Sequence, residues 1–304
     1  MANEWVEAMR AGDFERAWAV NDRDLAASSH PPKHTGPRHL QRIWRAEPLA
    51  GKHVLVRCYH GLGDTIQFLR FMQPLRGVAS SVSIWCQREL LPLVERAAGV
   101  DRALALHDGT PELEFEVDIE IMEVPHALKV GRGQIEMGAP YIKLPPKSMP
   151  VSLDREGLTV GLVWEVGQWD KRRAIPPELL RHLAVRGVAL HSLQRDATTE
   201  SLTGIGARDI STPEIATLGH LLREVDLVIC VDTMVAHLAG ALGCEAWVLL
   251  HADCDWRWPS TGGRSLWYPS VRLFRQTTAG DWSTVIAEVR EALQERVTAE
   301  QRVA

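Results

Sequence analysis

Short apolar runs alternate with segments of helical periodicity along most of this chain. In the first half, HVLVRCY (53–59) and SVSIWC (81–86) have the composition of strands, and each is followed by an amphipathic stretch. Strands that alternate with helices of roughly ten to fifteen residues indicate βαβ units and a parallel sheet. The sequence therefore predicts an α/β fold.

A proline-rich break, LPPKSMPVS at 144–152, divides this alternation into two halves. The second half repeats the pattern from LTVGLVW (158–164) onward. With 304 residues, the chain has room for two domains of about 150 residues each. We predict two Rossmann-like, doubly wound domains, 38–150 and 151–304, that face each other across a cleft. In such sheets, ligands bind at the carboxyl ends of the strands.

The first 37 residues have a different pattern. NEWVEAMRAG (3–12) and DFERAWAVNDRDLAA (13–27) carry apolar residues at helical spacing, and Gly12 separates them. The pair resembles one tetratricopeptide-like hairpin, and such a unit cannot bury its own apolar face. We expect it to pack on the main body or on a partner. Residues 28–37 have the composition of a linker.

The overall charge excludes one class of partner. The formal net charge is -5 and the pI is near 6.2, so the basic field on which non-specific nucleic-acid binding depends is missing. The N-terminus is charged from its fourth residue, and no apolar run approaches 18 residues. We expect a cytoplasmic protein without a transmembrane segment, and peripheral contact with a membrane stays open.

The five cysteines are widely spaced and include no C-x-x-C pair. Cys58, Cys86 and Cys230 fall inside apolar, strand-like runs. A reduced, buried thiol is therefore the expected state of these three residues.

The loop HGLGDTIQ (60–67) follows the first predicted strand. Its two glycines permit a sharp turn and a close approach of the backbone to a ligand. Ile66 stands where a dinucleotide fingerprint needs glycine, and no Walker motif is present. These absences disfavour a sugar-nucleotide epimerase or dehydrogenase. Asp64 has two interpretations: a helix N-cap, or an ionised carboxylate that acts as a base.

A second loop lies within LVICVDTMVAHLAGALG (227–243). Asp232 and Thr233 follow a buried strand and can cap the next helix, whose free amides suit a diphosphate. His237 comes in the second turn of that helix. It is either a ligand contact or a histidine satisfied within the core.

A third loop carries the basic run Lys171, Arg172 and Arg173. The run is either a solvated face or a group that neutralises a departing phosphate. Two D-x-D strings also occur, at 22–24 and 253–255. The first is interpreted as surface charge. The second could hold a divalent cation with a diphosphate, but the basic run and the helix termini supply the same electrostatics, so no metal is expected.

Three segments together resemble one family. GLGDTIQFLRF, VDTMVAHLAGALG and DWRWPSTGGRSLWYPSVRLFRQ are similar in order and spacing to segments of glycosyltransferase family 9, the ADP-heptose:lipopolysaccharide heptosyltransferase-like proteins. Some members of that family have tetratricopeptide repeats in front. The resemblance covers about residues 40–295. It implies a GT-B fold, with the acceptor bound by the first half and a nucleotide sugar by the second.

The resemblance also implies roles for residues. Asp64 corresponds to the proposed general base. The donor diphosphate is expected to meet a set of residues in the second half, namely Arg173, Lys171, Asp232, Thr233, His237 and the amides of Met234 and Val235. Candidates for acceptor contacts, chosen by their position near Asp64 or in the EVPHAL turn, are His60, Gly63, Gln67, Arg70 and His126.

Two functional hypotheses follow. The first is an inverting, metal-independent glycosyltransferase without cofactors, which moves a sugar such as a heptose from a nucleotide-diphospho-sugar to a hydroxyl of a glycan, lipopolysaccharide or protein. The second is a non-catalytic GT-B-fold binding or assembly protein that docks a partner through its N-terminal helices. WEVGQW (164–169) favours the second modestly, because Glu165 replaces a small residue of the family pattern.

Overall fold

The computed structural model describes residues 3–28, 35–41, 43–136, 138–147, 153, 157–167 and 170–303. The chain divides into two compact units. The first unit contains Met1–Pro145 and Trp256–Ser260, and the second contains Pro146–Asp255 and Thr261–Ala304. Residues 29–34 of the predicted linker and 148–152 of the predicted break lie outside the described residues.

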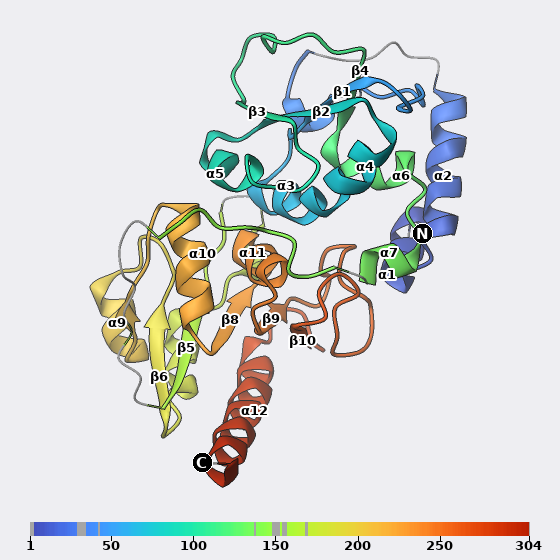
Figure 1. Cartoon of the computed structure of the whole chain (residues 1–304). Coiled ribbons are helices and arrows are strands. Elements are labelled where there is room, and N and C mark those ends of the chain that lie inside the picture. Colours follow the sequence, from blue (N-terminus) through green and yellow to red (C-terminus); the bar gives the residue numbers. More distant parts are fainter. Residues whose placement is uncertain are drawn as a thin grey trace. The chain divides into compact units, whose positions relative to one another are not determined.

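The sheet of the first unit is fully parallel, with the order β3-β2-β1-β4 (Figure 1). Its strands are β1 (His53–Arg57), β2 (Ser81–Cys86), β3 (Arg102–Ala105) and β4 (Val117–Glu120). The order reverses between β1 and β4, which makes this pair the topological switch point, the place where ligands bind in open α/β sheets.

The helices of this unit are short. The helix expected after β1 forms as three consecutive pieces: α3 (Leu62–Phe68), a 3₁₀ turn (Leu69–Phe71) and α4 (Met72–Val78). The remaining α-helices of the main body are α5 (Leu91–Val94), α6 (Val124–Ala127) and α7 (Arg132–Glu136).

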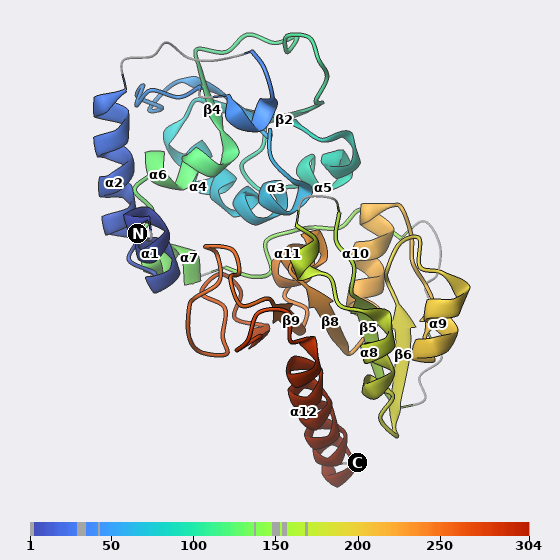
Figure 2. The ribbon, with the colours of Figure 1, turned by 180° about the vertical axis from the view of Figure 1, so that it is seen from behind.

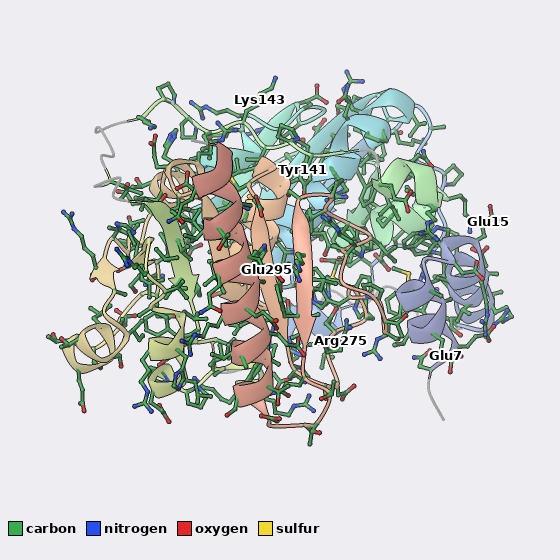
Figure 3. The ribbon with its side chains drawn as sticks, turned by 90° about the horizontal axis from the view of Figure 1, so that it is seen from below. Glu7, Glu15, Tyr141, Lys143, Arg275 and Glu295 are labelled. Carbon is green, nitrogen blue, oxygen red and sulfur yellow. The ribbon has the colours of Figure 1, made fainter. Side chains whose placement is uncertain are left out.

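Two helices precede this sheet, α1 (Glu4–Ala11) and α2 (Phe14–Ala27). Gly12 ends α1 in the left-handed conformation with φ 71°, which glycine adopts without steric cost. Both helices are amphipathic: Glu7 and Glu15 point away from the protein (Figure 3), whereas Trp18 is buried.

The apolar face of α1 and α2 packs on the main body of the first unit. The indole Nε1 of Trp18 donates a buried hydrogen bond of 2.8 Å to the carbonyl of Val130. Asp22 accepts hydrogen bonds from Lys129 and shares one of 2.8 Å with His126 of α6. The two helices are thus part of the first unit.

The sheet of the second unit has six parallel strands in the order β10-β9-β8-β5-β6-β7. They are β5 (Leu158–Val163), β6 (Val188–Ser192), β7 (Arg208–Asp209), β8 (Leu227–Val231), β9 (Ala246–Leu250) and β10 (Val271–Arg275). Here the switch point lies between β5 and β8. The predicted α/β fold with parallel sheets is confirmed.

Helices cover both faces of this second sheet. Figure 2 shows α8 (Pro177–Leu180) and the C-terminal α12 (Trp282–Val303) on its near side. Leu180 of α8 and Trp282 of α12 share a hydrophobic core with alternate residues of β5 and β8. The other α-helices of this unit are α9 (Thr199–Ile205), α10 (Ile215–Glu224) and α11 (Met234–Leu242).

The predicted buried thiols are confirmed. Cys58, Cys86 and Cys230 are free and buried. Burial raises the pKa of all three thiols, that of Cys86 to about 12, so none is a reactive thiolate at neutral pH. Within the described part of the chain, no helix has the length and apolar character needed to cross a bilayer.

Candidate functional site

The sheet topology gathers the predicted site residues at the two switch points. In the first unit, Arg57 at the end of β1 lies opposite Glu120 at the end of β4, so the loops after these strands meet at one edge. In the second unit, Val163 at the end of β5 lies opposite Cys230 of β8. Each unit therefore brings two of the loops singled out by sequence to its ligand-binding edge.

Asp64 is the third residue of α3, which begins at Leu62, so its interpretation as the N-cap is wrong by position. Its carboxylate nevertheless reaches back to the helix start, where Oδ2 accepts a 2.8 Å hydrogen bond from the N–H of Gly61. The other oxygen, Oδ1, pairs with the guanidinium of Arg257. The side chain is 22% exposed. A carboxylate has about four acceptor positions, so Asp64 can still receive a hydroxyl proton.

Arg257 is a site residue that the sequence did not single out. Its Nε donates a 2.6 Å hydrogen bond to Oε1 of Gln67, and its guanidinium carbon lies 4.1 Å from the ring centroid of Trp256. Gln67 is fully buried. Arg257 therefore fixes the predicted acceptor residue Gln67 and the carboxylate of Asp64 in one arrangement.

Two glutamates that the sequence did not single out complete the first switch point: Glu120 ends β4, and Glu123 lies in the 3₁₀ turn after it. Glu120 is 4% exposed and accepts a 2.7 Å hydrogen bond from the N–H of Met122. Burial raises the pKa of Glu120 well above its usual value, and the neighbouring Glu123 and Asp64 act in the same direction. Burial also raises the pKa of Glu123, to about 7. Both groups hold protons more tightly than surface carboxylates do.

His60 lies beside this pair, with Nε2 at 4.0 Å from Oε1 of Glu120. Burial is the main cause that lowers the pKa of His60, so its imidazole is neutral at pH 7. It is one of the predicted acceptor residues that the structure brings into the same neighbourhood as Asp64.

A cavity of about 200 Å³ lies at this edge of the first unit. The side chains around it come from α1 and α2, from Gln41 before β1, from the loop after β1, from the end of β4 and the turn after it, and from the segment 256–260; they include Trp5, Gln41, His60, Glu120, Glu123 and Trp256. The rings of Trp5 and Trp256 meet edge to face, with centroids 4.9 Å apart. The N-terminal helices therefore form one wall of the cavity.

The other four predicted acceptor residues, Gly63, Gln67, Arg70 and His126, do not line this cavity. Gly63 is the second residue of α3. Arg70 donates hydrogen bonds of 3.1 and 3.0 Å to the carbonyls of Gln67 and Ile135 and stacks over Tyr141, which Figure 3 labels. These contacts join two segments of the backbone.

His126, the candidate acceptor contact from the EVPHAL turn, is buried. It is only 3% exposed, because α2 covers it. Its ring lies against Trp18 and Trp44 and bonds Asp22. The 22–24 string is surface charge as predicted, with the side chain of Asp22 55% exposed, and Asp22 also attaches α2 to α6.

At the second switch point, the structure brings Arg173 and Asp232 together. Nη1 of Arg173 donates a 2.9 Å hydrogen bond to the carbonyl of Asp232 and lies 3.8 Å from its carboxylate. Nε of Arg173 is buried and has no hydrogen-bond partner among the described residues. A buried N–H in this state is one that an anion could satisfy.

The N-terminus of α11 begins directly behind this pair. Thr233 is its N-cap, and its hydroxyl accepts a 3.3 Å hydrogen bond from the N–H of Val235. Met234 and Val235 are the first two helical residues, whose amides precede the intrahelical bonding pattern. A helix N-terminus favours negative charge, so the predicted diphosphate contacts lie in chemically suitable positions.

His237 is buried, and its Nδ1 lies 2.9 Å from the hydroxyl of Tyr268. Gly240, one turn later, makes this contact possible: a Cβ there would lie 2.4 Å from the ring of Tyr268. Of the two interpretations weighed for His237, the geometry favours the histidine satisfied within the core. Tyr268 was not anticipated.

The basic run separates into three different environments. Lys171 donates a 3.2 Å hydrogen bond to the carbonyl of Val166. Arg172 forms two hydrogen bonds of 2.9 Å with Asp170 and lies 3.5 Å from Asp253. The Arg172 hydrogen bonds lower the pKa of Asp170 to about 2. Among its three residues, only Arg173 contacts the start of α11.

Asp253 of the second D-x-D string and Glu165 of the WEVGQW loop (164–169) both have exposed side chains. Asp253 is 76% exposed and faces Arg172, and the described residues include no group of three potential metal ligands. Glu165 is exposed, and its N–H donates to Gln194 at 2.8 Å. Gln168 and Trp169 of the loop lie outside the described residues.

Comparison with known proteins gives one relative in sequence and several in structure. No family model matches the chain. Protein FlbA of Caulobacter vibrioides is 25% identical over 289 residues, a match that covers 83% of this chain. The chain spans about half, 48%, of the length of that curated relative.

Three solved structures illustrate the likeness in fold. A family 9 glycosyltransferase from Veillonella parvula superimposes with a TM-score of 0.57 at 10% identity, covering 83% of this chain and 99% of that one. The iron-containing dodecameric glycosyltransferase TibC from enterotoxigenic E. coli gives 0.54 at 14%, covering 79% and 67%. ADP-heptose lps heptosyltransferase II of E. coli gives 0.53 at 15%, covering 82% and 99%.

These identities are low, so the likeness concerns the fold. The two parallel α/β sheets of this chain resemble those of glycosyltransferase family 9 heptosyltransferases, an architecture of the GT-B kind.

Proposed function

We propose that this protein is an inverting glycosyltransferase that moves a sugar from a nucleotide-diphospho-sugar to an acceptor hydroxyl. The observation that carries the proposal is the setting of Asp64, a partly exposed carboxylate at a switch point, oriented by Gly61 and Arg257. The fold supports the same conclusion, because the solved structures it resembles are named as glycosyltransferases.

In the proposed reaction, Asp64 takes the proton from the acceptor hydroxyl. The acceptor oxygen then attacks the anomeric carbon as the bond from that carbon to the diphosphate oxygen breaks, and the configuration inverts. General-base assistance of this kind contributes about 10²- to 10⁴-fold. Arg257 is a positioning residue in this scheme, since it holds the carboxylate and Gln67 together.

The leaving diphosphate would be stabilised in the second unit. Arg173 offers a buried N–H without a partner among the described residues, and Thr233, Met234 and Val235 form the start of α11. Lys171 is placed nearby in the same 3₁₀ turn as Arg173. Fixed positive charge at a leaving group replaces a metal in this scheme, so we propose metal-independent transfer.

The choice of donor and acceptor follows the same proposal. A TibC structure is described with bound ADP-D-beta-D-heptose, so an ADP-sugar is the first donor to test. Acceptors belong to the glycan, lipopolysaccharide or protein class.

The test measures release of nucleoside diphosphate from ADP-, GDP- and UDP-sugars by the purified protein, with and without EDTA. Proton NMR then reports the anomeric configuration of the product. We expect release with one nucleotide class, unaffected by EDTA, and an inverted product. Retained configuration, or activity that EDTA abolishes and a divalent cation restores, would refute the mechanism.

A second candidate is a non-catalytic binding or assembly protein, in which α1 and α2 dock a partner in the manner of a tetratricopeptide unit. The pairing of Asp64 with both Gly61 and Arg257 favours it, since a purely structural carboxylate would be held in the same way. Absence of any binding of ADP-, GDP- and UDP-sugars in a calorimeter would select this alternative.

A further inference from the structure

The loop between β1 and α3 leads to Asp64, and β2 runs beside β1 (Figure 1). The parallel pairing of these strands places Arg57 opposite Trp85, and the N–H of Cys58 donates a 3.0 Å hydrogen bond to the carbonyl of Trp85. The ladder therefore continues for one residue past β1. Because paired strands advance together in this register, Gln87, the first residue after β2, lies beside the start of the loop.

The side chain of Gln87 joins the two ends of this loop. Its Nε2 donates a 2.7 Å hydrogen bond to the carbonyl of His60, and its Oε1 accepts a 3.0 Å hydrogen bond from the hydroxyl of Thr65. The partners fix the orientation of the amide, because a carbonyl oxygen can only accept and must face the nitrogen. His60 and Thr65 enclose Asp64 in the chain, so one side chain links both sides of the proposed base.

Gln87 has a firm attachment for this contact. Its backbone carbonyl accepts a 3.0 Å hydrogen bond from the N–H of Leu90, where β2 passes into a 3₁₀ turn (Arg88–Leu90). Thr65, its partner in α3, is fully buried. Sites built on strands and helices are more precise than sites built on loops. Gln87 therefore attaches the loop to the sheet and to the helix together.

The position of the loop determines the position of the carboxylate, because the two are in close contact. Oδ2 of Asp64 accepts the 2.8 Å hydrogen bond from the N–H of Gly61, and a Cβ at position 61 would lie 3.2 Å from the same oxygen. Glycine is thus the residue that permits this approach. Hydrogen bonds of N–H groups lie within about 2.7–3.2 Å, so a small movement of the loop would weaken the bond that orients Asp64.

A side chain from the strand on the other side of β1 also reaches the loop. Oε1 of Glu120, at the end of β4, accepts a hydrogen bond from the N–H of Tyr59. At 3.4 Å this bond is longer than the usual range for an N–H donor. The 2.7 Å contact between Gln87 and His60 is therefore the stronger restraint on the loop.

We propose that Gln87 is a positioning residue for sugar transfer, which holds the loop so that the carboxylate of Asp64 keeps the orientation needed to accept the acceptor proton. The catalytic role rests on the proposed function, whereas the link to the carboxylate rests on hydrogen bonds within the first unit. The proposed donor contacts belong to the second unit. Loss of the Gln87 side chain should therefore lower kcat and leave donor affinity unchanged.

The near-isosteric variant Gln87→Met removes both hydrogen bonds. We expect kcat to fall roughly 10- to 100-fold, the upper value being the cost of a misplacement of about 1 Å, with the donor Kd from calorimetry unchanged. Gln134→Met is the matched control, because Gln134 holds a different loop of the same unit through a 2.9 Å hydrogen bond from the N–H of Gly131. A wild-type kcat in Gln87→Met, or equal losses in the two variants, would overturn the proposal.

Substitutions of Thr65 separate the hydrogen bond from the fold. Thr65→Ser keeps the hydroxyl and should retain most of kcat. Thr65→Val removes the hydroxyl and should lose less than Gln87→Met, because the bond from Gln87 to His60 remains. Combining Thr65→Val with Gln87→Met should cost no more than Gln87→Met alone, since both changes remove one shared contact. Losses that add up would mean that the two side chains act separately, which contradicts the proposal.

A measurement without turnover keeps this proposal distinct from the proposed function. In the ¹⁵N-labelled full-length protein, the amide proton resonance of Gly61 reports its hydrogen bond to the carboxylate of Asp64. We expect this resonance to move upfield in Gln87→Met and to stay in place in Gln134→Met. If no nucleotide sugar is consumed, transfer fails, and the Gly61 resonance alone decides the role of Gln87. An unmoved resonance in Gln87→Met would overturn that role whether or not transfer occurs.

Discussion

The switch point of the first unit gathers carboxyl groups beside aromatic rings, whereas that of the second gathers an arginine and the N-terminus of a helix. Glu120 and Asp64 lie at the end of β4 and in the helix after β1. Arg173 lies in the turn after β5, and α11 begins after β8. Parallel sheets of the same winding thus present opposite chemistry at equivalent edges.

Under the proposed function, the difference follows from what each edge would bind. A proton acceptor needs a carboxylate and tolerates a neutral ligand, while a diphosphate needs donors and positive charge. Because winding fixes only the position of the loops, side chains decide the chemistry. Substitutions that remove the charged group at one switch point should therefore leave ligand binding at the other switch point unchanged.

The largest expected effect comes from removing the carboxylate of Asp64, the proposed base. Asp64→Asn preserves the shape, but its single amide oxygen can accept only one of the two hydrogen bonds that Gly61 and Arg257 donate to the carboxylate, and amide oxygen is a poor proton acceptor. We expect kcat for transfer to fall about 10²- to 10⁴-fold, with little change in donor affinity measured by calorimetry. Asp108→Asn, on an exposed residue of the same unit, is the control. Wild-type rates in the Asp64 variant would exclude it as the base.

The second effect concerns the cationic edge, and the basic run supplies its own control. Arg173→Met removes the arginine that contacts the start of α11 and should lower kcat/KM about 10²- to 10³-fold, the usual cost of losing one electrostatic donor. Arg172→Met removes a neighbour whose side chain is 65% exposed and bonded to Asp170, and should change kcat/KM little. Equal losses in the two variants would mean that the run acts as a diffuse charge.

Sequence patterns predicted the parts of this structure that depend on local order. Each βα unit is set by neighbours in the chain, so both parallel sheets were predictable, and so was the place of Thr233 at a helix start. β7 was missed because it has two residues, both exposed, and no apolar pattern.

Contacts between distant residues were beyond such patterns. Asp64 and Arg257 are 193 positions apart, and no local sequence pattern around either residue predicts its contact with the other. Glu120 and Glu123 were not singled out, and they face a cavity only because β4 pairs with β1. The burial of His126 was not predictable because it depends on α2, more than 100 positions earlier.

The third prediction concerns the pH dependence of stability that the carboxyl of Glu123 causes at the first switch point. Glu123 has a folded-state pKa of about 7, above its usual 4.5, so the folded protein keeps a proton that the unfolded chain releases in this range. Stability then falls as pH rises from 4.5 to 7, by up to about 1.4 kcal/mol per pH unit. Glu123→Gln cannot titrate, so its stability relative to wild type should rise by about 1–3 kcal/mol from pH 5 to pH 8.

Urea unfolding followed by tryptophan fluorescence at the two pH values measures this difference. Glu116→Gln is the control, because a hydrogen bond from Lys52 lowers the pKa of Glu116 and places its titration below this range. Parallel curves for wild type and Glu123→Gln between pH 5 and 8 would show that the carboxyl is solvated and that the first switch point is less dry than its geometry indicates.

The smallest expected effect tests whether α2 belongs to the first edge. Asp22 and Asp24 stand two positions apart on α2, yet Asp22 bonds His126 and Lys129 and Asp24 is exposed. Asp22→Ala leaves a buried imidazole without this partner and should cost about 1 kcal/mol in urea unfolding, while Asp24→Ala should cost less than half as much. Because burial of Asp22 is slight, the loss should shrink in high salt. Equal stabilities for the two variants would mean that Trp18 alone holds the helix, and that the wall of the cavity depends on apolar packing rather than on this ion pair.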